Sequence, residues 1–295
     1  MAAAAGGKTE LSEAAGWRRT KNRIATVLMV LSFVVVIIPL GFVLFTVIAK
    51  GASIISWQFL TSPIPPNVLP ADVGGMGPAV LGTIEITALA TVMAVPLGVL
   101  GAIYLNEYGG GNWLARFIGF MADVMTGVPS IVMGLFIFSI WVLHFGFSGL
   151  AGAFALGCLM LPIVIRSTYE MLRLVPDSLR EGSYALGASK SRVTATVVLP
   201  AALGGIVSGA LLGVARAAGE TAPLLFTILT VTEANANVFS GANTSLPSQI
   251  FTNASSPYPG AQARGWGAAL TLIAIAFILM IAARFVTARY ARYQH

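Results

Sequence analysis

The chain has 295 residues, of which 57% are hydrophobic and 9% are charged, and its mean hydropathy is +0.85. A soluble domain carries about 25% charged residues, so this composition excludes an ordinary soluble fold and predicts a surface that faces lipid. With a single cysteine, Cys158, and two histidines, the chain cannot form an internal disulfide and has little material for thiol, metal or Ser-His-Asp chemistry.

Six apolar runs are candidates for membrane helices, which need roughly 20 mostly apolar residues each. In chain order they are Ile24–Ile48, Val80–Tyr104, Phe117–Leu143, Leu150–Ile165, Ala201–Thr230 and Trp266–Phe285. The fourth is short and the fifth is long for one crossing. Helices are favoured over barrel strands because long apolar runs must satisfy every backbone group internally. The sequence therefore predicts an all-α integral membrane protein with six transmembrane helices.

Basic residues indicate the orientation. With the N-terminus inside, the outer side keeps only Lys50 and Arg264, and Arg216 lies within a span. The cytoplasmic side then holds 14 of the 17 basic residues, which are Lys8, Arg18, Arg19, Lys21, Arg23, Arg116, Arg166, Arg173, Arg180, Lys190, Arg192, Arg284, Arg289 and Arg292. The positive-inside rule then predicts both termini in the cytoplasm. The net charge of +6 is thereby explained by membrane orientation, and no nucleic-acid partner is expected.

The order of the spans divides the chain into five parts. We expect a cytoplasmic tail over residues 1–23, a first transmembrane helix over 24–49, an outer loop over 50–79, a core membrane domain over 80–286 and a cytoplasmic tail over 287–295. The first span follows basic residues as a signal peptide would, but it is too long for a signal core. We interpret it as an uncleaved anchor.

The loop between the fourth and fifth spans, Arg166–Pro200, is polar, basic and patterned. Ser178–Leu186 can form a short helix, after which Gly187 permits a sharp turn because glycine adopts positive φ without steric cost. Ser189–Val198 can form a second helix, and Pro200 suits the first turn of the next membrane helix. The pattern predicts a helix-turn-helix outside the membrane that could dock into a groove on a partner.

The same loop resembles the signature of importer-type ABC permeases, E-A-A-x3-G-x9-I-x-L-P. Glu181, Gly187, Leu199 and Pro200 match in register, while Gly182 and Ser183 replace the two alanines and Val197 replaces the isoleucine. The resemblance implies a coupling helix that docks on a cytoplasmic ATPase, with Glu181 meeting the ATPase and Gly187 setting the turn. The alternative is an ordinary basic loop that obeys the positive-inside rule.

A partial nucleotide-binding motif occurs at Gly7-Lys8-Thr9. The P-loop pattern G-x-x-x-x-G-K-[ST] also needs an earlier glycine, and Ala2 stands at that position. We therefore expect no cofactor in this chain, and we expect ATP to be bound by a separate partner subunit.

Arg216 and Glu220 form a charged pair in the fifth span. They are four residues apart and so share one helix face, and an ionised group at the bilayer centre costs roughly 2.5–3.5 kcal/mol. Pro223 cannot donate its backbone hydrogen bond to Gly219, so a helix break is expected between these two residues. The pair is either a self-neutralising ion pair that fixes helix packing or part of a wet anion path, with Arg216 as the cation and Glu220 restraining it.

Several stretches resemble the A-type permease subunits of phosphate-specific ABC importers, over residues 20 to 290. The most specific is Ala215–Leu225, which holds the charged pair. The others are Gly127–Phe136, Tyr104–Tyr108, Gly74–Pro78 followed by Gly82-Thr83, and Leu246-Pro247. Met280 is a departure, because the family often has an asparagine late in the last span.

The resemblance implies a type I ABC importer permease fold that translocates inorganic phosphate across the cytoplasmic membrane by alternating access, without catalysis. It places Arg216, Glu220 and Thr221 on the substrate pathway. It also implies three partners, namely a C-type phosphate permease subunit, two copies of an ATPase and an external phosphate-binding protein.

Three other readings remain open. An ABC permease for sulfate, molybdate or an organic solute would differ only in cargo. An ATP-independent anion channel or secondary transporter would fit the charged pair but leave the coupling motif without a role. An intramembrane enzyme would need a nucleophile and base or a metal set, and the sequence assembles none.

Overall fold

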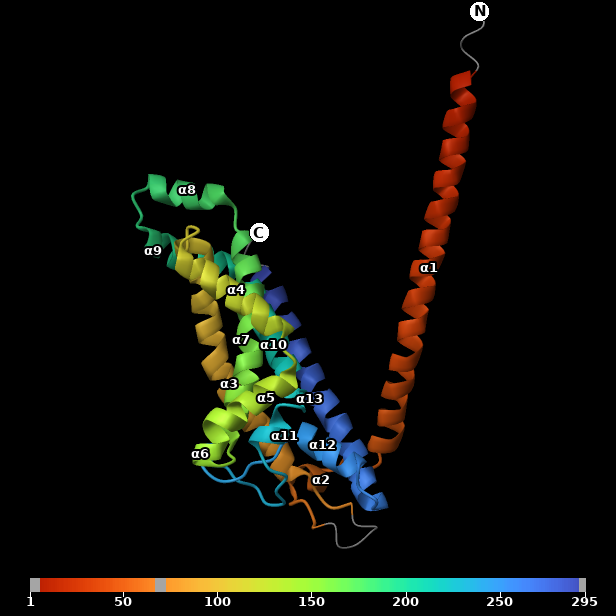
Figure 1. Ribbon diagram of the computed structural model, residues 1–295, viewed down its shortest axis with the longest axis vertical. Coiled ribbons are helices and arrows are strands. Elements are labelled where there is room, and N and C mark those ends of the chain that lie inside the picture. Colours follow the sequence, from red (N-terminus) through yellow and green to blue (C-terminus); the bar gives the residue numbers. More distant parts are fainter. Residues whose placement is uncertain (1–5, 67–72, 292–295) are drawn as a thin grey trace, which may run out of the picture. The chain divides into compact units, whose positions relative to one another are not determined.

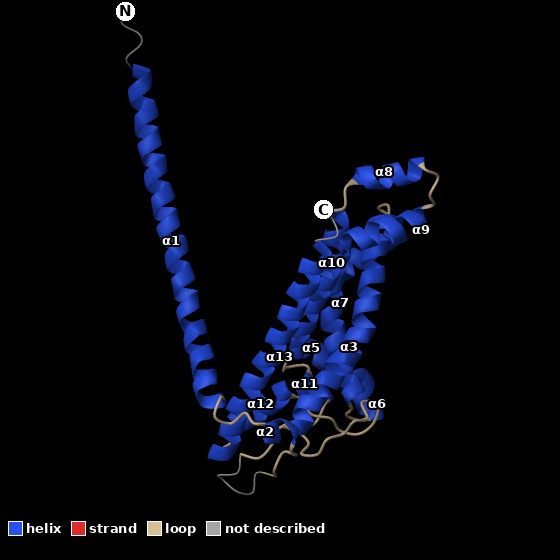
Figure 2. Ribbon diagram, turned by 180° about the vertical axis from the view of Figure 1, so that it is seen from behind, coloured by secondary structure: helices blue, strands red, loops and turns tan. Residues whose placement is uncertain are grey.

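The computed structural model describes residues 6–66 and 73–291 (Figure 1). Throughout these ranges the regular structure is helical and contains no strand (Figure 2). The chain forms two compact units, residues 1–49 and 50–295, and each is described by itself.

The first unit is nearly all of helix α1 (Gly6–Gly51), which contains the predicted first span and continues through Pro39. The helix begins well before the predicted span, inside the stretch expected to be a tail, because residues 8–16 are rich in the helix formers Lys, Glu, Leu and Ala. The apolar side chains of its span are almost all exposed. A long exposed apolar helix of this kind requires a lipid or protein partner.

The second unit is built on four long helices that lie side by side (Figures 1 and 2). They are α3 (Gly77–Ile103), α7 (Gly149–Arg173), α10 (Leu199–Ala218) and α13 (Pro259–Ala291). With α1, five described helices are long and apolar enough to cross a membrane, and the number reaches six if one bent pair counts as a single span. The helical membrane fold is therefore confirmed, while a sixth span depends on the bent pair.

The predicted third span, Phe117–Leu143, is not one helix. Helix α4 (Trp113–Gly127) and the run from α5 (Ser130–Ile137) through a π-turn, η2 (Phe138–Val142), to α6 (Leu143–Phe145) meet at 107°. Pro129 has no N–H to continue the helix and pushes the preceding residue into extended backbone. Val128 accordingly has φ −73° and ψ 127°. The apolar pattern alone did not predict this bend.

The boundaries of the fourth and fifth spans also differ from the prediction. Helix α7 continues past Ile165 to Arg173, so Arg166, which forms an ion pair with Asp123 of α4, lies within the helix. Helix α10 begins at Leu199 with Pro200 in its first turn, as expected, but it is not a separate helix. It continues a helical run that starts with α9 (Lys190–Val193) and passes through a π-turn, η3 (Thr194–Val198).

The bundle has two distinct ends (Figure 1). The α8 end carries α8 (Asp177–Ala185), α9 and the π-turn η1 (Tyr104–Tyr108) that follows α3. The α12 end carries α2 (Trp57–Thr61), α6 and α12 (Leu246–Ala254), so the predicted outer loop over 50–79 contains a short helix, α2. Part of this loop, residues 67–72, lies outside the described residues.

Arg264 shows that the α12 end is a packed structure. Orientation counting treated it as a loop cation, but it is fully buried near the start of α13. Its Nε donates to Asn253 Oδ1 (3.1 Å) and its Nη1 donates to the Val73 carbonyl (3.3 Å). The side chain therefore ties α13 to α12 and to the loop before α3.

Small residues allow the long helices to pack closely. A Cβ at Gly209 of α10 would lie 2.6 Å from Ser167 Cβ of α7. A Cβ at Gly98 of α3 would lie 2.7 Å from Val164 Cγ1, which also belongs to α7. Helix α7 is therefore the central element against which α3 and α10 pack. Its apolar middle and the end of α10 enclose the cavity described next.

Candidate functional site

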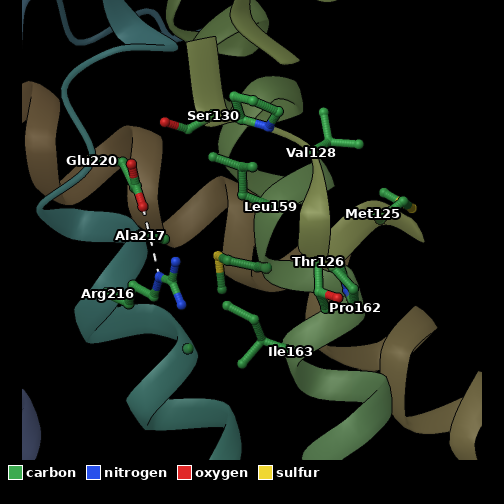
Figure 3. Close-up of a pocket in the computed structure, with 13 residues that line it drawn as sticks. Met125, Thr126, Val128, Ser130, Leu159, Pro162, Ile163, Arg216, Ala217 and Glu220 are labelled. Carbon is green, nitrogen blue, oxygen red and sulfur yellow. Dashed lines mark ion pairs between the residues drawn. The ribbon is translucent and has the colours of Figure 1, made fainter. Parts of the chain in front are cut away.

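A cavity of about 250 Å³ lies where the end of α10, the middle of α7 and the bend between α4 and α5 meet. Figure 3 shows Arg216 and Glu220 on one wall, with Leu159, Pro162 and Ile163 of α7 across from them. Most of its lining residues are apolar, and its polar side chains are those of Thr126, Ser130, Arg216 and Glu220. The lining residues are Met125, Thr126, Val128, Pro129, Ser130, Leu159, Met160, Pro162, Ile163, Gly213, Arg216, Ala217 and Glu220.

The charged pair sits at the end of α10. The helix ends at Ala218 with Gly219 as its C-cap, so Glu220 lies in the following turn rather than on the helix face that the sequence predicted. Arg216 Nε is 3.7 Å from Glu220 Oε1, which is too long for a hydrogen bond. The Arg216 side chain is 71% exposed and that of Glu220 is 22% exposed. The Glu220 carboxylate thus attracts the Arg216 guanidinium but leaves the N–H donors of the guanidinium open to the cavity.

The turn after α10 is held from two sides. The Glu220 N–H donates to the Ala217 carbonyl (3.1 Å), and Pro223 precedes helix α11 (Leu224–Thr227). Gly134 of α5 packs directly on this turn, because a Cβ there would lie 2.6 Å from Pro223 Cα. The predicted break residues Gly219 and Pro223 are therefore both in the turn, and α5 braces it.

Thr221 is not among the residues that line the cavity. Its carbonyl accepts the N–H groups of Leu224 (3.1 Å) and Leu225 (3.3 Å), so it stabilises the start of α11. The structure brings Arg216 and Glu220 into one site and leaves Thr221 beside it.

Sequence reasoning missed the contribution of the bend between α4 and α5. Thr126 and Ser130 bring hydroxyl groups to the cavity from the two sides of that bend. Helix α5 also begins there, and the N–H groups of a first helical turn have no acceptors within the helix. The signal was Pro129 inside an apolar run, two residues after Gly127. This combination disfavours a continuous helix.

The residues of the predicted coupling helix lie together at the α8 end, far along the bundle from α12 (Figure 1). Glu181 and Gly182 are exposed on α8, and Ser183 Oγ donates to the Leu179 carbonyl (2.8 Å). Gly187 has φ +79°, and the next N–H, that of Ala188, bonds back to the Ser183 carbonyl (3.2 Å). This arrangement is the glycine-terminated helix end expected from the sequence.

Leu199 and Pro200, the other two residues of the signature, lie outside α8. Both are inside the continuous helical run from Lys190 to Ala218, where Leu199 is partly buried and Pro200 is exposed. The π-turn η3 precedes them, and the Leu199 N–H reaches back to the Thr194 carbonyl. These residues shape the helix that carries α9 rather than the exposed face of α8.

Metal chemistry has no obvious ligand set in the described ranges. Across residues 6–66 and 73–291, no group of three or more His, Cys, Asp or Glu side chains is arranged to hold a metal ion. Of the acidic residues in apolar surroundings, Asp123 pairs with Arg166, and Glu85 has a buried Oε2 without a hydrogen-bond partner.

The fold has counterparts among solved transporters. A chain from one crystal form of the inward-facing MetNI methionine ABC transporter aligns with a TM-score of 0.59 at 18% identity, covering 72% of this chain and 94% of that one. A second crystal form aligns with a TM-score of 0.57. The structure thus has the fold of the type I ABC importer permeases.

Sequence comparison gives the family. The profile of the binding-protein-dependent transport system inner membrane components matches residues 94–292. Phosphate transport system permease protein PstA 1 of Mycobacterium tuberculosis H37Rv is 46% identical over 281 residues, which cover 93% of this chain and 91% of that protein. PstA of Yersinia pestis is 42% identical, covering 92% of both chains. The chain therefore belongs to the PstA family of the binding-protein-dependent inner membrane permeases.

Proposed function

We propose that this chain is the transmembrane permease subunit of an ATP-driven importer that moves inorganic phosphate across the cytoplasmic membrane. Family membership supports the class and the cargo. The observation that carries the proposal in this molecule is Arg216, an exposed guanidinium at the broken end of α10 that opens into a cavity.

The chemistry of the cavity suits a tetrahedral oxyanion in transit. A guanidinium presents a fork of N–H donors that matches two oxygens of a phosphate. Glu220 lowers the net charge of the site, so an anion would be attracted to Arg216 without being held tightly. Ser130 and Thr126 add hydroxyl groups to the lining of the cavity. A transport pathway needs this weak, multi-point binding, because the cargo must leave as readily as it enters.

The same proposal assigns the two ends of the bundle. The α8 end faces the cytoplasm, with both chain termini on that side, and Glu181, Gly182, Ser183 and Gly187 form the surface on which an ATPase docks. The α12 end faces outward and receives phosphate from an external binding protein. A C-type permease subunit completes the pathway, two ATPase subunits bind the ATP, and this chain makes or breaks no covalent bond. Alternating access then follows from closure and reopening of the ATPases.

The experiment is uptake of labelled phosphate and labelled sulfate at limiting concentration. Cells that lack this chain, and any second phosphate importer, are compared with cells complemented by it. Loss and rescue of phosphate uptake alone is the expected result. Rescue of sulfate uptake instead would keep the permease and replace its cargo, and unchanged uptake of both anions would overturn the proposal. Uptake that persists without any co-purifying ATPase would favour an ATP-independent channel.

A further inference from the structure

One arginine with a largely enclosed side chain, Arg180, holds the first turn of α8. Arg180 Nη1 donates to the Val175 carbonyl (2.6 Å) and to Asp177 Oδ1 (3.1 Å), and its Nη2 donates to the Leu172 carbonyl (2.9 Å) and to Glu107 Oε1 (3.1 Å). Leu172 lies in the last turn of α7, and Val175 lies just after that helix, in the short link to α8. One guanidinium therefore joins the end of α7, the start of α8 and the turn after α3.

Glu107 is the distant partner in this cluster. It lies 73 positions from Arg180 in sequence, on η1, and its side chain is only 4% exposed, while that of Arg180 is 13% exposed. Asn106 Nδ2 also donates to Glu107 Oε1 (2.7 Å). A buried carboxylate of this kind is tolerated only when it is paired and hydrogen-bonded. The hydrogen bonds from Asn106 and Arg180 thus hold the Glu107 carboxylate in place.

The rest of α8 has few supports of its own. No residue of Asp177–Ala185 is buried, and the helix lies across the α8 end of the bundle (Figure 1). Beyond α8, α9 contacts η1 once more, because Lys190 Nζ lies 5.3 Å from the centre of the Tyr108 ring. Helix α8 is therefore exposed along its length, and Arg180 fixes its first turn to the bundle.

Of the elements joined by Arg180, α7 lines the cavity directly, and α3 packs against the helices that line it. Helix α7 lines it with Leu159 and Met160, among others. Helix α3 packs against α7 and α10 in one buried cluster, in which Ile86, Ala90 and Ala94 of α3 meet Met160 and Ala217. Because close-packed interiors transmit displacement rather than absorb it, a shift of α3 and α7 would change the walls of the cavity.

We propose that the Glu107–Arg180 ion pair is a positioning element that links α8 to α3, so that a force applied to α8 moves α3 and α7 together. This inference rests on the proposed function, in which the force comes from an ATPase docked on α8. Arg180 and Glu107 touch neither the cargo nor the nucleotide. They determine how much of the α8 motion reaches the cavity.

The test measures phosphate translocated per ATP hydrolysed by the complete transporter in proteoliposomes, together with the amount of ATPase bound. Glu107→Gln is expected to lower this ratio by roughly fivefold or more, at the lower end of typical coupling between sites, with ATPase binding unchanged. The matched control is Asp177→Asn, which removes a carboxylate at the same 3.1 Å distance from Arg180, but one that is 87% exposed. It should leave the ratio within about twofold of the unmodified transporter.

A second variant covers the case in which Glu107→Gln fails to assemble. Glu107→Gln combined with Arg180→Gln leaves no unpaired buried charge, yet it still lacks the ion pair. If the two residues act as one link, the double variant is no worse coupled than either single variant. Assembly of the double variant with a normal ratio, or a loss in the double variant equal to the sum of the two single losses, would overturn the link. A normal ratio in every variant would leave the proposed function intact, whereas absence of phosphate transport by the unmodified complex would refute that function itself.

Discussion

Two arginines of this chain lie in opposite kinds of surroundings. Arg180 at the α8 end is 13% exposed, and its two terminal nitrogens make four contacts of 2.6–3.1 Å. Arg216 at the cavity is 71% exposed, and its carboxylate partner stands off at 3.7 Å. A guanidinium with satisfied donors fixes structure, whereas one with open donors can bind an anion. The comparison separates the mechanical part of the molecule from the part that meets cargo.

The α8 end is tested most severely by Gly187→Pro. Gly187 has φ +79°, and proline holds φ near −65°, so the turn after α8 cannot form. We expect complete loss of ATPase binding in a pull-down, with membrane insertion unchanged. Gly187→Asn is the matched control, because asparagine tolerates positive φ. Full ATPase retention by the proline variant would mean that α8 is not the docking element.

Arg180→Ala should cause the largest loss of stability. It leaves Glu107 buried and unpaired, for which the expected cost is about 3–5 kcal/mol in the free energy of unfolding. Unfolding of the purified protein in detergent measures it. Arg192→Ala, which removes an exposed arginine of α9, should change stability by about 0.5 kcal/mol or less. Equal losses in the free energy of unfolding for the two substitutions would mean that the contacts of Arg180 do not stabilise the protein more than an exposed arginine does.

Gly134→Val tests the wall that braces the turn after α10. The added side chain would collide with the Pro223 backbone, which cannot move without changing the Arg216–Glu220 turn. Overpacking of this kind costs about 1–3 kcal/mol, and we expect reduced phosphate uptake as well. Gly119→Val on α4 is the control, because a Cβ at Gly119 meets no atom within 4 Å. Unaltered phosphate uptake by the Gly134 variant would mean that the shape of the turn after α10 does not affect transport.

Arg216→Ala should have the smallest effect on stability, about 0–1 kcal/mol, because its ion pair is long and exposed. Its effect on phosphate uptake should nevertheless be about tenfold or more, since one charge-assisted hydrogen bond contributes roughly 1.5–3 kcal/mol. Glu220→Ala should also impair uptake with assembly preserved. Arg216→Lys keeps the charge but loses the fork, so it should restore only part of the uptake. Normal uptake in the alanine variants of both residues would return the pair to a packing role.

Much of the fold was predictable from local sequence. Long apolar runs predicted the membrane helices, because hydropathy and helix formation depend on neighbouring residues. The proline in Ala215–Leu225 predicted an end to the helix before Pro223, and the helix ends at Ala218. Gly187 predicted the turn after α8 because positive φ is a local requirement of the backbone.

Other features depended on which distant residues meet. The ion pair that fixes α8 joins residues 107 and 180, and Glu107 had no local signal beyond its position at the end of a span. Arg264 counted as an outer-loop cation in the sequence, yet tertiary packing buries it against Asn253 and Val73. The bend at Val128–Pro129 became part of the cavity only because α7 and α10 lie beside it.

The sequence by itself determined the membrane class, the helical content, and the position and spacing of the charged pair. These follow from composition and from short-range backbone rules. Only the tertiary structure decided that Arg216 opens into a cavity while Arg180 is enclosed. The physical reason is that exposure and pairing of a charge are set by the elements packed around it, and those elements come from distant parts of the chain.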